Sequence, residues 1–209
     1  MLTFQFIRHA ESEANLRPHI ISGQSVDAPL SAEGRKQAAA LGVRYQPFIK
    51  RKNYKLWSST ALRTQQTAAI FCEKVGIEIE ELQLSPLLLE LSQGDWAGLV
   101  RSETYTPEVL AQIQADNLNF KAPNGESQAE VANRMMQWLE TQITENQVHT
   151  YFLVFTHGVA IKCLFQRIMQ SNPQFTHLIN IQNTSITEFK HSEKGFSLEK
   201  LNDHAHLYF

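Results

Sequence analysis

The sequence is poor in cysteine, in net charge and in metal-ligand motifs. Its two cysteines, Cys72 and Cys163, lie within helical patterns, and neither belongs to a Cys-x-x-Cys or similar metal-binding spacing. We therefore expect free, buried thiols in a reducing compartment and no metal site. The formal net charge of -2 and the pI of about 6.4 exclude a bulk attraction to nucleic acid or anionic lipid. An anion site in this chain must be a local cluster of cationic side chains.

Long apolar runs and linker-like stretches are missing as well. Residues 2–7 form an apolar run that is too short for a signal-peptide core, and no segment approaches the roughly 20 apolar residues that cross a bilayer. No Pro-, Gly- or Ser-rich stretch divides the 209 residues, of which 43% are hydrophobic. These features predict one domain over residues 1–209, located in the cytoplasm, with neither a membrane nor a nucleic acid as partner. They leave the oligomeric state open.

Strand and helix patterns alternate along the chain. Apolar runs predict strands over residues 2–7, 54–58, 151–155, 185–189 and 196–201, with a shorter extended segment at 87–91. Helical spacing predicts helices over residues 33–45, 60–75, 127–145 and 159–169, with another after Pro107. This alternation is typical of an α/β fold, a three-layer α/β/α sandwich with a mostly parallel central sheet.

Five polar side chains stand where these extended segments end or in the turn that follows. They are Arg8, His9, Arg63, Glu90 and His157. Taken singly, each has an ordinary structural explanation, such as a solvent-facing arginine or a structural histidine. The carboxyl ends of parallel strands, however, meet at one edge of an open sheet, where ligands bind, and the helix after His157 adds free amides and a positive dipole end. One shared anion site therefore explains the set better than separate structural roles.

These residues belong to a longer series of short motifs that spans nearly the whole chain. In chain order the motifs are Arg8-His9-Ala10-Glu11-Ser12, Asn15, Gly23, Leu30-Ser31-x-x-Gly34, Ser58-Ser59-x-x-x-Arg63-Thr64, Glu90, Gly94-x-Trp96-x-Gly98, Gly125-Glu126-Ser127, His157-Gly158 and Asn202-Asp203-x-x-His206-Leu207. Their order and spacing resemble the histidine phosphatase (phosphoglycerate mutase-like) superfamily. The resemblance implies that family's fold and phosphoryl transfer through a phosphohistidine.

The resemblance also implies a role for each of the five side chains. His9 is the nucleophile, Arg8, Arg63 and His157 hold the phosphoryl oxygens, and Glu90 is the general acid on the leaving oxygen. The chemistry agrees with these roles, because phosphoryl transfer depends mostly on positioning and on fixed positive charge. We expect the two guanidinium groups and a protonated His157 to supply that charge, so that the reaction needs no metal and no cofactor.

Asn15 and Gly23 are implied, by the same resemblance, as further phosphate-binding positions in the loop after the first strand. Ser12 could assist them, although a serine just after a strand is more often a cap. His19, in the same loop, has the simpler explanation of an exposed loop histidine. Residues 98–123 are long enough to form a lid over the pocket.

The sequence distinguishes a phosphatase from a mutase. Phosphoglycerate mutases of this family carry a Glu-Arg-His-Tyr-Gly-like segment after the acid and a pair of adjacent arginines downstream. Here Glu90 is followed by Leu-Ser-Gln-Gly at 91–94, and the only basic residues within 98–122 are Arg101 and Lys121. We therefore favour hydrolysis of a small phosphorylated metabolite over a cofactor-dependent phosphoglycerate mutase.

Two other functions stay open at this stage. A catalytically silent phospho-ligand binding protein is disfavoured because the nucleophile, the cationic groups and the acid are all present. A phosphoprotein phosphatase is disfavoured because a lid formed by residues 98–123 would restrict the pocket to small molecules. The sequence does not identify the physiological ester.

We predict that the protein releases inorganic phosphate from a phosphomonoester without added 2,3-bisphosphoglycerate, because a paired-arginine carboxylate pocket is missing from residues 98–122. A phosphate-release assay, run beside a coupled assay for phosphoglycerate interconversion, checks this. Rapid interconversion with little hydrolysis would contradict the prediction.

Overall fold

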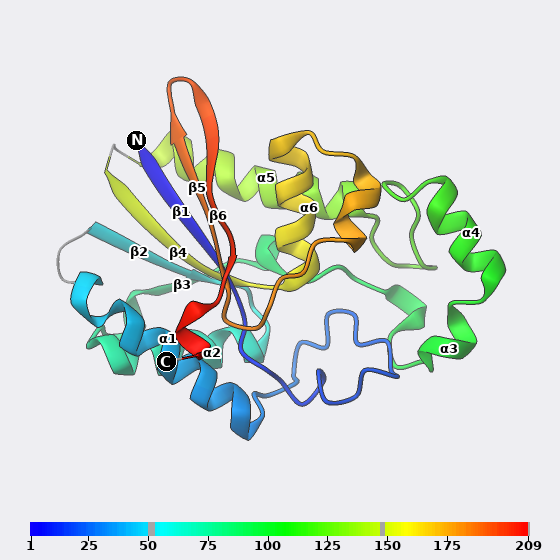
Figure 1. Ribbon diagram of the computed structural model, residues 1–209, viewed down its shortest axis with the longest axis horizontal. Coiled ribbons are helices and arrows are strands. Elements are labelled where there is room, and N and C mark those ends of the chain that lie inside the picture. Colours follow the sequence, from blue (N-terminus) through cyan, green and yellow to red (C-terminus); the bar gives the residue numbers. More distant parts are fainter. Residues whose placement is uncertain (50–52, 147–148, 209) are drawn as a thin grey trace.

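Six strands form one sheet in the order β3-β2-β4-β1-β5-β6. The computed structural model describes residues 1–49, 53–146 and 149–208 (Figure 1). The strands are β1 (Leu2–Arg8), β2 (Asn53–Ser58), β3 (Leu82–Leu84), β4 (Thr150–Thr156), β5 (Ile186–Ser192) and β6 (Gly195–Asp203). The first four are parallel, and β5 and β6 form an antiparallel hairpin at the edge next to β1. The predicted mostly parallel sheet is confirmed.

Four long helices cover the sheet, two on each face (Figure 1). Helices α1 (Ala32–Ile49) and α2 (Leu62–Val75) pack together on one face, and α5 (Gln128–Glu145) and α6 (Gly158–Met169) pack together on the other. Two short helices, α3 (Arg101–Thr104) and α4 (Pro107–Ala115), form a lobe beyond the carboxyl ends of the strands. The three-layer α/β/α sandwich is therefore as predicted.

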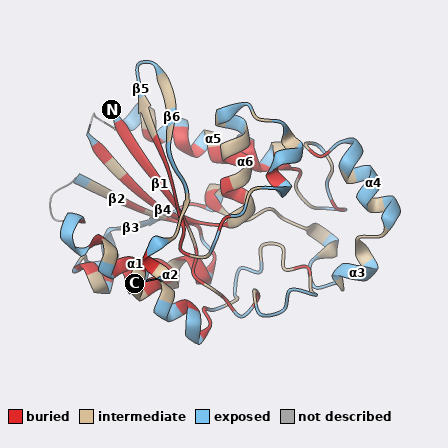
Figure 2. Cartoon of the chain, viewed as in Figure 1, coloured by how far each residue is buried: buried red, intermediate tan, exposed pale blue. Residues whose placement is uncertain are grey.

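The core lies on both faces of the central strands β1 and β4. Phe4 and Phe6 of β1 pack with α5 and α6, whereas Ile7 packs with α1 and α2, and all three are 0% exposed. Consecutive side chains of a strand point to opposite faces, so a strand covered on both sides needs a continuous apolar run. Each such burial stabilises the fold by roughly 1.5–3 kcal/mol. Figure 2 shows this buried centre and the more exposed α3–α4 lobe.

The state of the two cysteines is as predicted from the sequence. Cys72 and Cys163 are free and buried. Burial raises the pKa of the Cys72 thiol to about 11 and that of Cys163 to about 12, which makes both thiols unreactive at neutral pH. None of the described helices has the length and apolar character needed to cross a membrane.

The prediction of an extended segment at 87–91 is wrong. Pro86–Leu88 form a 3-10 helix, η2, whose first turn is capped by the Ser85 hydroxyl, and Glu90 follows in a loop. Leu88 is fully buried against α5 all the same. A run of leucines predicts burial rather than conformation, and Pro86 has no N–H for a strand ladder. The edge strand is the three-residue β3 just before this turn.

Two helix boundaries also differ from the prediction. Helix α1 continues past Tyr45 to Ile49 with Pro47 inside it. Proline removes the hydrogen bond to the carbonyl of Val43, but Val43 is 56% exposed, so water can reach that carbonyl. At the other end the Ser31 hydroxyl accepts from the Gly34 amide at 3.0 Å, as the sequence predicts. Helix α2 begins at Leu62, two residues later than expected.

Candidate active site

Three neighbouring strands end at the same level and deliver their next residues to one place. The Arg8–Thr156 and Ser58–Phe155 pairs close the parallel ladders. One further backbone bond on each side, from the amide of His9 to Thr156 and from the amide of Ser59 to Phe155, continues the alignment beyond the strands. As a result the rings of His9 and His157 lie 5.2 Å apart, centroid to centroid. The two histidines, which lie 148 positions apart in the sequence, therefore share one site.

His9 is arranged as a nucleophile. Its Nδ1 lies 2.7 Å from the carbonyl oxygen of Ala10, which can only accept, so Nδ1 carries the proton and Nε2 keeps a lone pair. The ring is 4% exposed. Burial first, and then the charges of Arg63 and Arg8, hold the pKa of His9 well below its usual range. A neutral imidazole with a free Nε2 is the form that attacks phosphorus.

His157 is also neutral, which differs from the protonated ring expected from the sequence. Its Nδ1 lies 3.0 Å from an amino nitrogen of Arg63, and a guanidinium can only donate, so Nδ1 accepts. Its Nε2 then donates to the Ser59 hydroxyl at 2.7 Å. Burial and the Arg63 charge lower the pKa of His157 well below its ordinary value. Positive charge in the site therefore resides on the arginines.

Arg63 lies in the first turn of α2 and is 4% exposed. One amino group donates to the carbonyls of Gln24 and Ser25, both at 2.8 Å, and the other donates to His157. Burial lowers the Arg63 pKa to about 10, so the group remains a cation at neutral pH. The backbone contacts fix the guanidinium beside the two histidines.

Arg8 ends β1 with an unused donor. One of its amino groups donates to the carbonyl of Ile181 at 2.6 Å, but its Nε is buried and has no hydrogen-bond partner. Burial lowers its pKa from the ordinary value. A Cβ on Gly158 would lie in ordinary van der Waals contact with this Nε, at 3.4 Å, so the start of α6 passes directly beside the guanidinium. A buried, unpaired N–H of a cation is the kind of group that a bound oxyanion satisfies.

Glu90 lies at the amino end of α6. Its two carboxylate oxygens accept from the amides of Leu91, Val159 and Ala160 at 3.0, 3.1 and 3.0 Å. The positive end of a helix dipole favours a negative group in this place. The α6 amides that the sequence assigned to the anion are thus occupied by Glu90. In turn, they fix the position of its carboxyl group.

The two phosphate-binding residues implied in the first loop lie in different surroundings. The Asn15 side-chain oxygen accepts from the amide and hydroxyl of Ser12, so its hydrogen bonds are local. Gly23 has φ +53, and a Cβ there would lie 3.2 Å from Gln93 Cβ, in the loop after Glu90. Its neighbour Gln24 donates to the Glu90 carbonyl at 3.1 Å and accepts from Arg63. The Gly23 loop therefore borders the site, whereas Asn15 caps its own turn. His19 is exposed.

A group that sequence reasoning missed is Arg134 on α5. Its guanidinium donates to the carbonyls of Leu87 and Glu90 at 2.8 and 3.0 Å and forms a two-point ion pair with Glu126. Glu126 also accepts from the Ser92 amide at 2.9 Å. These contacts hold the loop that carries Glu90. Glu126 belongs to a recognised motif, but Arg134 has only the pattern of an ordinary amphipathic helix.

The C-terminal motif supports the loop on the other side of the site. His206 Nε2 lies 2.9 Å from the Thr184 hydroxyl, and the Thr184 amide donates to the Arg8 carbonyl at 3.0 Å. Next to it, the Asn183 side chain donates to the His9 carbonyl at 2.9 Å. The tail thus fixes the backbone of Arg8 and His9 through the 183–184 turn.

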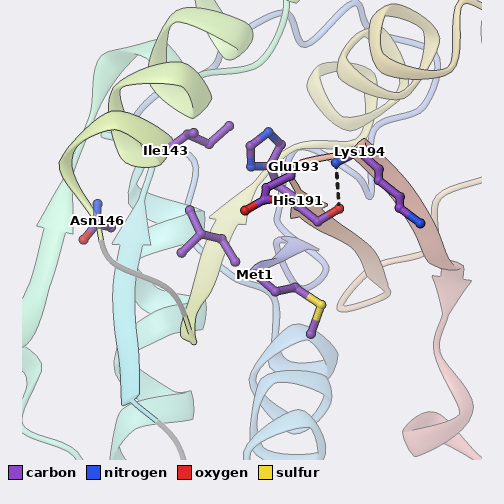
Figure 3. A pocket seen from close by; sticks show the side chains of 8 residues that line it. Met1, Ile143, Asn146, His191, Glu193 and Lys194 are labelled. Atoms are coloured by element: carbon purple, nitrogen blue, oxygen red, sulfur yellow. Dashed lines mark hydrogen bonds between the residues drawn. The ribbon is translucent and has the colours of Figure 1, made fainter.

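A hollow at the opposite end of the sheet is separate from this site. It has a volume of about 520 Å³ and lies at the amino end of β1, on the side away from the paired histidines, and Figure 3 draws its side chains, among them Met1, Ile143 and His191. None of the five predicted site residues lines it. Among residues 1–49, 53–146 and 149–208, no group of three or more His, Cys, Asp or Glu side chains could hold a metal ion.

Comparisons with known proteins agree with this geometry. Residues 4–204 match the family model of the histidine phosphatase superfamily (branch 1). The chain is 30% identical to a probable phosphoglycerate mutase GpmB of Yersinia enterocolitica and 29% identical to that of Serratia proteamaculans, over 99% of this chain and 95% of each relative. Two solved structures cover 99% of this chain and are themselves covered completely. They are the Entamoeba histolytica phosphoserine phosphatase in complex with 3-phosphoglyceric acid, with a TM-score of 0.82 and 25% identity, and Bacillus stearothermophilus YhfR, with a TM-score of 0.83 and 23% identity.

We predict that Arg134→Gln lowers phosphatase turnover roughly tenfold and makes the rate depend more steeply on the pKa of the leaving alcohol, because Glu90 loses the contacts that position its loop. Rates measured across substituted phenyl phosphates check this.

Lys190→Gln is the control, because it breaks the 2.9 Å ion pair with Glu199 on the β5–β6 hairpin, away from the site. An unchanged leaving-group dependence in Arg134→Gln, with thermal stability lowered as much as in the control, would show that Arg134 is purely structural.

Proposed function

The chain belongs to the histidine phosphatase superfamily, and on this premise we propose that it is a phosphomonoesterase that acts on a small phosphorylated metabolite through a phosphohistidine on His9. The observation that carries the proposal is that a neutral His9, with a free Nε2, lies beside the buried Arg63 and the mostly buried Arg8, whose buried Nε has no hydrogen-bond partner. An imidazole nucleophile beside fixed positive charge is suited to phosphoryl transfer.

In the first step His9 Nε2 attacks phosphorus in line with the ester oxygen. A nitrogen–phosphorus bond forms, the phosphorus–oxygen bond breaks, and the carboxyl group of Glu90 gives its proton to the departing oxygen, which leaves as an alcohol. Arg8 and Arg63 stabilise the negative charge on the phosphoryl oxygens. The neutral His157 holds Arg63 in place and borders the same oxygens.

In the second step water attacks the phosphohistidine. The Glu90 carboxylate accepts the proton of that water, the nitrogen–phosphorus bond breaks, and inorganic phosphate leaves. Glu90 is therefore protonated again and His9 is neutral again. The contacts of Glu90 with Leu91, Val159 and Ala160 keep its carboxyl group at one place through both steps.

A phosphoglycerate mutase is the second candidate, and the names of the bacterial relatives favour it. Hydrolysis is better supported by the cations around Glu90. Arg134 is held by a two-point ion pair with Glu126, and Lys121 is a single cation in an exposed pair with Glu130 at 2.8 Å, so these two residues do not form a pair of adjacent free cations for a substrate carboxylate. Arg101 is single and exposed. The described residues of the α3–α4 lobe therefore contain no pair of adjacent cations. We propose that this lobe acts as a lid over the site.

The proposal predicts turnover of para-nitrophenyl phosphate at mildly acidic pH by the unaltered protein and a loss of roughly a thousandfold or more in His9→Ala, because the nucleophile is gone. Release of para-nitrophenol measures it.

His191→Ala, a change at the far end of β5, should retain the unaltered rate. Equal and negligible rates in the unaltered protein and in His9→Ala, across several phosphomonoesters, would favour a phospho-ligand binding protein instead.

A further inference from the structure

Two adjoining hollows lie between the α3–α4 lobe and the 3-10 helix η4 (Pro173–His177). The inner one has a volume of about 260 Å³ and the outer one about 700 Å³. Five residues line both of them, namely Arg101, Tyr105, Ile113, Asn117 and His177. Shared walls on this scale indicate one continuous channel that leads from the interior of the lobe to its outer surface.

The inner end of this channel lies beside the backbone that holds Glu90, the group that protonates the leaving oxygen in the proposed mechanism. Its walls include Leu91 and Val159, and the amides of these two residues hold the carboxylate of Glu90. The group attached to the ester oxygen, rather than the phosphoryl group, therefore faces the channel.

Three aromatic rings form one cluster in the wall of the inner hollow. The Trp96 ring contacts Tyr105 edge-on, with centroids 5.5 Å apart, and Phe120 at 5.9 Å. The outer end is apolar and open, because Leu110 on α4 is 52% exposed and Leu178 after η4 is 76% exposed. Helix α4 has no buried residue, and Figure 2 shows it largely exposed. Large apolar side chains gathered at the mouth of a cavity indicate a binding surface.

The polar groups of the channel are mostly engaged with one another. Asn117 accepts from His177 at 2.6 Å and from Gln128 at 3.1 Å, and Lys121 and Glu126 have ion-pair partners outside the channel. The Arg101 guanidinium lies over the Tyr105 ring at 5.3 Å. A three-carbon, highly charged leaving group such as a glycerate would fill little of this space and would find few free partners.

We propose that this channel receives the leaving alcohol and that the substrate class is phosphomonoesters of elongated, partly apolar alcohols, with Ile113 as a specificity-determining residue. The proposal rests on the proposed phosphatase function. It names the chemistry of the alcohol and adds a binding surface that the phosphoryl-transfer groups do not include.

A series of n-alkyl monophosphates with two, four, six and eight carbons tests it, because chain length changes the channel contacts and leaves the leaving-group pKa nearly constant. We expect kcat/KM to rise with each added carbon, by up to about fourfold per buried methylene, and Ile113→Asn to lower the ratio of kcat/KM for octyl phosphate to that for ethyl phosphate. Ile79→Asn, at an exposed isoleucine outside the lobe, is the matched control.

Leu178→Asn is a second variant, and because this side chain is largely exposed, its substitution should not affect folding. We expect it to flatten the rise in kcat/KM between six and eight carbons. A kcat/KM that is independent of chain length, or a rise that both variants retain, would overturn the channel. Concentration-dependent self-association that Leu178→Asn removes, with no change in the chain-length profile, would assign the surface to a second copy of the chain and would also overturn it. No turnover of any alkyl or aryl phosphate would instead reject the phosphatase function itself.

Discussion

Burial of positive charge without a carboxylate in direct contact is the constraint on which the rest of this site depends. Arg63 is buried and Arg8 is mostly buried, with its Nε out of reach of water, and in the part of the chain that the structure describes neither forms an ion pair. Backbone carbonyls of Gln24, Ser25 and Ile181 accept from them instead. The charge of the nearby Glu90 offsets only part of the effect of burial, which lowers the pKa of both arginines. A cation whose hydrogen-bond partners are all neutral is costly to bury, and an oxyanion that enters the site relieves that cost.

The same constraint explains the protonation of the histidines. Burial disfavours the charged form of each ring, and the two guanidiniums would also repel a third and a fourth positive charge, so the pKa of each histidine is lowered and both rings are neutral. Each ring then has one donor and one acceptor nitrogen, and the protein fixes which is which. The Ala10 carbonyl assigns the proton of His9 to Nδ1, and Arg63 together with Ser59 assigns that of His157 to Nε2. Neutrality makes His9 nucleophilic and makes His157 an orienting group.

The sequence predicts the parts of the site that depend on strand ends and misses those that depend on loop and helix packing. His9, Arg63 and His157 are predictable because parallel strands align their carboxyl ends, as the register shows. The loop position of Glu90 could not be predicted, because the three leucines before it can be buried equally well in a 3-10 turn and in a strand. Arg134 is also missed, since the two carbonyls that it binds at the site, those of Leu87 and Glu90, lie 47 and 44 positions away and carry no side-chain signature, and its ion pair with Glu126 gives no sign of them.

A phosphohistidine on His9 is the central claim, and its direct detection tests the account most sharply. The protein, mixed with para-nitrophenyl phosphate and quenched rapidly at alkaline pH, can be digested and its phosphorylated peptide sequenced by mass spectrometry, with ³¹P NMR to distinguish the two ring nitrogens. The account predicts an acid-labile phosphoryl group on Nε2 of His9 that forms and decays fast enough to support turnover. Turnover without any phosphoryl-protein, or a label on another residue, would contradict it.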